Sequence, residues 1–181
     1  MKRITYIAIA ATACVALVGT WILSGLYSMA ADAPHSAVVT RLIETLRDRS
    51  IASHARGAKV PDLEAAALVA EGAEHYAAMC VGCHLAPGLE DSELRPGLYP
   101  QPPILAKRRV RDPAENFWII KHGIKMSAMP AWGATHDDEA IWGMVAFLRK
   151  LQGLSPDAYQ QLVARGRGEG ANQETHEHGQ H

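Results

Sequence analysis

The longest apolar stretch of the chain lies at its N-terminus, directly after Lys2 and Arg3. Residues 4–31 carry no charged side chain, and a helix of that length spans about 42 Å, more than the roughly 30 Å of a bilayer's hydrocarbon core. The segment therefore predicts a retained single-pass anchor over residues 1–31, with the rest of the chain exported. Cleavage of a signal peptide after the small residues near Ala30 is the alternative.

Downstream, apolar positions recur with the period of a helix, and no segment alternates with the period of a strand. Val39, Leu42, Ile43 and Leu46 share one face of a predicted helix over residues 38–56, which suits either a membrane surface or packing against a downstream domain. Further helices are expected over residues 63–79, 113–121, 137–151 and 155–164. The predicted fold class is all-α.

Changes in this pattern divide the chain into four parts. The expected parts are the anchor (1–31), an amphipathic helix with its linker (32–62), a compact domain (63–153), and a short helix followed by a disordered tail (154–181). Residues 87–103 hold five of the ten prolines, so we expect a long loop inside the compact domain. The tail contains His176, His178 and His181, which we interpret as solvated residues, with transition-metal binding as the alternative.

The charge balance argues against a nucleic-acid-binding protein. Eighteen Lys and Arg against nineteen Asp and Glu give a formal net charge of −1, whereas nucleic-acid binders normally show a basic excess. No Ser/His/Asp pattern or carboxylate pair indicates catalysis, so no catalytic residue is predicted. The densest basic run is Lys107, Arg108, Arg109 and Arg111; it is either a solvated loop or a rim that attracts acidic partners or neutralises the carboxylates of a bound group.

The chemistry is indicated by one pentapeptide, residues 80–84, in which Cys80, Cys83 and His84 form a C-x-x-C-H motif. This is the attachment sequence of c-type haem, with two thioether bonds to the porphyrin and the adjacent imidazole under the iron. A thioredoxin-like C-x-x-C would need strand–helix alternation, and structural zinc would need two further ligands at suitable spacing. The motif therefore predicts one covalent haem c, with His84 as an axial ligand.

A second axial ligand is expected downstream, within residues 121–133. Met129 is the favoured ligand because Pro130 stiffens the chain after it, and methionine ligation raises the reduction potential. Met126 and His122 are the alternatives. The predicted metal ligands are thus His84 and Met129.

Residues 63–152 resemble a class I c-type cytochrome. The matching features are a helix with Gly72 and Tyr76 before the haem motif, a methionine–proline loop, and a last helix with Trp142. The resemblance implies that the two terminal helices cross at a glycine–aromatic contact. It also implies that a proximal-loop carbonyl, of Pro102 or Pro103, accepts the other N–H of His84.

The resemblance also implies a membrane-associated respiratory electron carrier, not a complete enzyme. We expect redox protein partners such as a membrane dehydrogenase, reductase or oxidase, with the haem domain in the periplasm, tethered to a bacterial inner membrane. Alternatives are a soluble periplasmic form after signal cleavage and a cytochrome subunit of a membrane dehydrogenase or terminal reductase. Trp118 and Trp132 are expected as pocket walls, and His35 and His54 as surface or capping residues.

Overall fold

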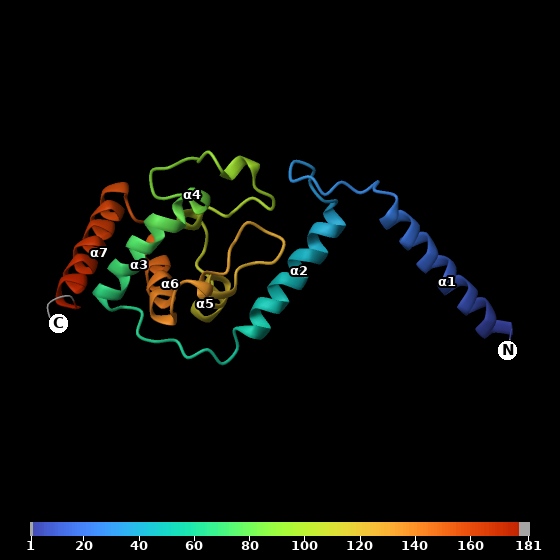
Figure 1. The fold of residues 1–181 in the computed structure, drawn as a ribbon, viewed down its shortest axis with the longest axis horizontal. Coiled ribbons are helices and arrows are strands. Elements are labelled where there is room, and N and C mark those ends of the chain that lie inside the picture. Colours follow the sequence, from blue (N-terminus) through green and yellow to red (C-terminus); the bar gives the residue numbers. More distant parts are fainter. Residues whose placement is uncertain (1, 178–181) are drawn as a thin grey trace. The chain divides into compact units, whose positions relative to one another are not determined.

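The computed structural model describes residues 2–177, and within them it contains helices and no strand, which confirms the all-α prediction. By contacts the chain separates into two compact units, Met1–Pro34 and His35–His181. The α-helices are α1 (Lys2–Leu23), α2 (Ala37–His54), α3 (Ala66–Met79), α4 (Val81–His84), α5 (Pro113–His122), α6 (Asp138–Leu151) and α7 (Pro156–Glu177) (Figure 1). Three short 3-10 helices, η1 (Arg95–Gly97), η2 (Leu105–Lys107) and η3 (Trp132–Ala134), interrupt the loops.

The first unit consists of α1 and the segment that follows it. The helix has 22 residues and a mean hydropathy of 2.1, and it is about 33 Å long at 1.5 Å per residue. It is therefore long and apolar enough to cross a membrane, and an N-terminal signal sequence would meet the same criteria.

The core of the second unit is built around α3, which lies between α6 and α7 (Figure 1). A Cβ atom on Gly72 of α3 would lie 1.9 Å from the carbonyl oxygen of Gly143 in α6. On the other side, a Cβ on Gly166 of α7 would lie 2.2 Å from the carbonyl oxygen of Ala70. Both helix pairs approach so closely that only glycine fits at these positions.

The aromatic residues of α6 divide between two contacts. Phe147 packs against Tyr76 of α3 with ring centroids 5.2 Å apart, while Trp142 stacks on Phe117 of α5 at 4.1 Å. The sequence predicted Trp142 at the helix crossing, but the backbone atoms nearest to Gly72 belong to Gly143 and Met144. Trp142 instead joins α5 to the core, which sets the position of the loop after α5.

Helix α2 packs against the rest of the second unit through a face that the sequence did not single out. Ile51 is 2% exposed and Ala55, directly after the helix, is also buried, whereas Leu42 and Leu46 are 69% and 70% exposed. The helix thus packs against the domain through Ile51 and Ala55, while its predicted apolar stripe lies largely on the outer side.

Helix α7 continues to Glu177, beyond Ala164, where the sequence predicted it to end. The close contact of Gly166 with α3 explains part of this extension, since it keeps residues after Ala164 against the core. His176 falls within α7, whereas His178 and His181 lie outside the described residues.

Candidate functional site

The C-x-x-C-H motif begins where α3 ends. Cys80 caps α3, and residues 81–84 form the single turn α4. The hydroxyl of Tyr76 donates a hydrogen bond to the carbonyl oxygen of Leu85 at 2.6 Å, and Leu85 itself is fully buried with a positive φ of 60°. The motif is therefore fixed to the core at its far end, although it is only one helical turn long.

The two motif cysteines are half-buried and form no disulfide. The pKa of the Cys80 thiol is raised to about 12, mainly by burial and to a lesser extent by the charge of the neighbouring Cys83. Reactive C-x-x-C dithiols have lowered pKa values, because the thiolate is the nucleophile. The environment of Cys80 favours an uncharged sulfur, such as a thioether, over a reactive thiolate.

One ring nitrogen of His84 forms a hydrogen bond, and the other is available to bind a metal. Its Nδ1 donates a hydrogen bond to the carbonyl oxygen of Pro103 at 2.9 Å. Because a carbonyl only accepts, Nδ1 carries the proton and Nε2 retains its lone pair, the tautomer that a metal requires. Burial lowers the pKa of His84; the hydrogen bond to Pro103 opposes this effect and the charges of Arg108 and Arg95 add to it, so the net change favours the neutral ring.

The loop after α5 is folded back tightly on itself. The amide of Ile124 donates to the carbonyl oxygen of Met129 at 3.1 Å, and the amide of Met129 donates to the hydroxyl of Ser127 at 3.2 Å. Gly123 has a φ of +66°, and a Cβ there would lie 2.6 Å from the Met129 carbonyl oxygen. The loop therefore holds the Met129 backbone in one place.

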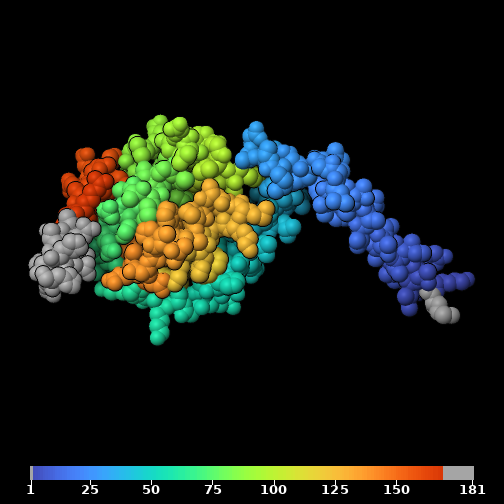
Figure 2. Space-filling model, viewed as in Figure 1, coloured from blue at the N-terminus to red at the C-terminus, as the bar shows by residue number. Residues whose placement is uncertain are grey.

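A cavity of about 310 Å³ connects these parts, a volume typical of ligand pockets. Cys83, His84 and Met129 line it, together with Arg108, Arg109 and Arg111 of the basic run. Figure 2 shows the loop of residues 85–104 (yellow-green) next to the loop after α5 (orange) on one face of the second unit. Cys80 lies at the end of α3, packed against the core cluster instead of among the cavity-lining residues.

The alternative sixth ligands lie elsewhere. Met126 is 82% exposed at the tip of its loop, and His122 is exposed at the end of α5 with its ring 5.1 Å from that of Trp118. Neither residue lines the cavity. Among the three candidates, Met129 is the one that shares the cavity with His84.

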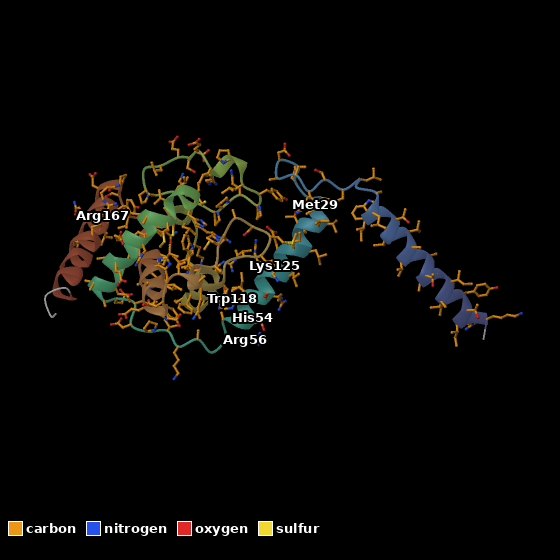
Figure 3. The ribbon with its side chains drawn as sticks, viewed as in Figure 1. Met29, His54, Arg56, Trp118, Lys125 and Arg167 are labelled. Atoms are coloured by element: carbon orange, nitrogen blue, oxygen red, sulfur yellow. The ribbon has the colours of Figure 1, made fainter. Side chains whose placement is uncertain are left out.

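The prediction that Trp118 and Trp132 are pocket walls is wrong, since neither lines the cavity. Trp118 instead lies beside His54, with ring centroids 5.6 Å apart (Figure 3). The sequence also missed three lining residues on α2, namely Glu44, Arg47 and Ile51. Their i, i+3, i+7 spacing places them on one helix face, which is the signal that could have found them.

The residues present fit a haem group. An imidazole with a free Nε2 and a methionine thioether line the same cavity, and both are established haem-iron ligands. The arginines that line this cavity are able to pair with the carboxylates of a porphyrin. No cluster of three or more His, Cys, Asp or Glu that could hold another metal ion occurs among the described residues.

The helical fold and this site define a class I c-type cytochrome-like domain. A family model described as "Cytochrome C oxidase, cbb3-type, subunit III" matches residues 67–148. The match indicates that this segment is a cytochrome c-type domain, which implies haem c binding, electron transfer and redox partners. No curated protein and no solved structure matches the chain.

Proposed function

We propose that residues 63–153 form a domain that binds one haem c covalently through Cys80 and Cys83, with His84 and Met129 as axial ligands. The protein is then a one-electron carrier with iron closed to substrates. The observation that carries this proposal is that His84 and Met129 line the same cavity, with Nδ1 of His84 hydrogen-bonded to the carbonyl oxygen of Pro103 so that Nε2 is available.

The chain's own residues determine how the site works. When bound, haem supplies a one-electron Fe(III)/Fe(II) couple. Pro103 keeps His84 in the ligating tautomer, and the thioether of Met129 favours the reduced state and raises the potential. The cavity's apolar residues, such as Ile120 and Leu148, lower the local dielectric, which disfavours the more highly charged oxidised form.

We further propose that α1 is a retained anchor and that the haem domain lies on the periplasmic side of a bacterial inner membrane. Lys2 and Arg3 are the first residues of α1 and precede its uncharged part, an arrangement that keeps the N-terminus in the cytoplasm. A tether of this kind raises the effective concentration of the carrier near integral partners. Removal of residues 1–31 as a signal peptide, giving a soluble periplasmic carrier, is the alternative.

A second candidate function is that of a cytochrome subunit in a membrane dehydrogenase, reductase or oxidase complex. The observation that favours it is the description of the matching family model, which names a subunit of an oxidase. Purification in mild detergent distinguishes the two: a free carrier migrates alone, whereas a subunit migrates with a catalytic polypeptide.

Replacement of Met129 tests the ligation. In Met129→Ala the far-red charge-transfer band of methionine-ligated ferric haem should disappear, and the ferrous protein should bind carbon monoxide. The potential should fall by on the order of 0.1 V, within the ~0.8 V over which axial ligands tune haem potentials.

Met126→Ala is the matched control, since Met126 belongs to the same loop but is exposed. It should keep the wild-type spectrum and potential. A wild-type spectrum in Met129→Ala, or loss of the far-red band in Met126→Ala, would contradict the proposed ligand set.

A further inference from the structure

Helix α2 lies upstream of the segment that matches the family model, yet it is attached to the haem domain at three places. Just before the helix, the amide of His35 donates to the hydroxyl of Tyr99 at 3.0 Å. In its middle, Asp48 accepts a hydrogen bond from Arg111 at 3.1 Å. At its end, His54 lies beside Trp118 of α5 (Figure 3). The helix is therefore held along its whole length.

The inner face of α2 forms part of the cavity wall. Glu44, Arg47 and Ile51 line the cavity that also contains His84 and Met129. Ile51 is buried, and the side chain of Arg47 is only 27% exposed. A guanidinium is thus brought to the cavity by an element outside the family-matched segment.

Asp48 fixes the position of Arg47. The Nε of Arg47 donates to Oδ1 of Asp48 at 2.9 Å, and the same oxygen accepts from Arg111, which also pairs with Glu115 at 3.2 Å. Among the described residues, no second carboxylate pairs with Arg47. The two terminal guanidinium nitrogens of Arg47 are therefore available to bind a group inside the cavity.

The charges around the cavity favour an anionic occupant. Four of the residues that line the cavity are arginines, whereas one, Glu44, is acidic. Burial, followed by repulsion from Arg111 and Arg47, lowers the pKa of Arg108, although Asp48 opposes this effect. Guanidinium groups remain charged in proteins, so this crowding costs free energy that a bound anion would offset.

We propose that α2 completes the haem pocket by supplying Arg47 as a partner of the haem carboxylates, and that Asp48 is its positioning residue. The inference rests on the proposed function, because the carboxylates are those of the haem. A cation at this place disfavours the oxidised haem, which carries one more positive charge, and so Arg47 raises the reduction potential.

The test compares Arg47→Gln with Arg41→Gln in the full-length haem protein, by potentiometric titration and resonance Raman spectroscopy. Arg41 is exposed on the same helix, outside the cavity lining, and serves as the matched control. Arg47→Gln should shift the redox equilibrium about threefold to tenfold toward the oxidised form, which lowers the potential by about 30–60 mV for a one-electron couple. The low-frequency propionate bending bands should shift as well, and Arg41→Gln should change neither.

Arg47→Lys keeps the charge but lacks the planar fork of nitrogens. It should retain a potential close to the wild type while the propionate bands still shift, and it keeps the test informative if Arg47→Gln does not accumulate. Equal potentials in Arg47→Gln and Arg41→Gln, or propionate bands unchanged in Arg47→Lys, would overturn the inference. Such a result with an intact far-red band leaves the proposed function standing, whereas a wild-type protein without haem refutes the proposed function itself.

Discussion

Gly123 links backbone conformation to Met129, the proposed axial ligand. Its φ of +66° turns the chain at the end of α5. Because it has no side chain, the carbonyl oxygen of Met129 can approach closely; a Cβ atom at this position would lie only 2.6 Å from that oxygen. The bond from Ile124 to that same carbonyl depends on this approach. A residue that never touches the cavity occupant therefore controls where Met129 lies.

Gly123→Ala should consequently perturb the haem without removing any ligand. Added to the strain of a positive φ, the contact with Met129 forces the loop outward, so we expect a weaker far-red band and a lower potential, measured by absorbance during redox titration. Gly97→Ala is the control, because nothing lies within 4 Å of a Cβ at Gly97. Identical titrations of both variants and the wild type would show that the loop does not depend on Gly123.

Asp48 provides a prediction of pH dependence. Burial raises its pKa, but hydrogen bonds and charges from Arg47 and Arg111 outweigh burial and lower it below the ordinary value of 3.8. Because the pKa is lower in the folded state, the carboxylate stabilises the fold at every pH above its ordinary pKa. This contribution is lost as the pH falls through the folded-state pKa.

Asp48→Asn should therefore reduce the free energy of unfolding at neutral pH by about 1 kcal/mol or less, since Asp48 is nearly half exposed. Denaturant titrations between neutral pH and about pH 2 should show the difference from wild type shrinking as the pH falls below 3.8. A constant Asp48→Asn deficit across this range would contradict the ion pairing.

At the scale of helices, the haem motif depends on the crossing of α3 and α6. Gly72 and Gly143 let the two backbones touch, and this contact sets the direction of α3, whose last residues lead into Cys80. Tyr76 then fixes the turn after the motif through Leu85. Packing far from the cavity thus determines where the cysteines lie.

Gly72→Ala should destabilise the protein by at least about 2 kcal/mol, because the added methyl group would overlap the backbone of Gly143. In contrast, Gly168→Ala in α7 meets nothing within 4 Å and should be neutral or stabilising by up to about 1 kcal/mol. Thermal unfolding followed by circular dichroism checks both. A wild-type midpoint for Gly72→Ala would mean that the helices do not cross this closely.

The sequence predicted the helices well where local signals are strong. The start of α5 was predicted from Pro113, and in the structure Asp112 caps it by accepting hydrogen bonds from two backbone amides. The periodicity of residues 137–151 predicted α6 within one residue. Such signals are local, because they depend on caps and on the period of one helix.

The predictions from the sequence were wrong where tertiary contacts determine which side of a helix is buried. In α2 the apolar pattern at Leu42 and Leu46 predicted a face for either a membrane surface or the domain, but the residue buried against the domain is Ile51, on the side where Asp48 pairs with Arg111. For the same reason the sequence could not show that Arg47 lines the cavity. Within the site, the C-x-x-C-H motif and Met129 were predictable because their chemistry is local, and their assignment as ligands stays a prediction.

At the scale of the whole molecule, an apolar helix and a haem domain have separate tasks. The first unit supplies a helix able to cross a membrane, and the second contains the cytochrome c domain with α2 against it. In the proposed arrangement the anchor restricts diffusion to the membrane surface, where integral redox partners are found. Neither task requires a catalytic residue, which agrees with an electron-transfer protein.

The most direct test of this account is the intact mass of the full-length protein, purified from the membranes of bacteria that mature c-type haem. The expected mass is that of the whole chain plus one haem, unchanged after extraction with acidified acetone, and the haem mass should be absent when both Cys80 and Cys83 are replaced by Ala. The mass of the bare polypeptide, or a haem that the solvent removes, would contradict covalent attachment and the function built on it.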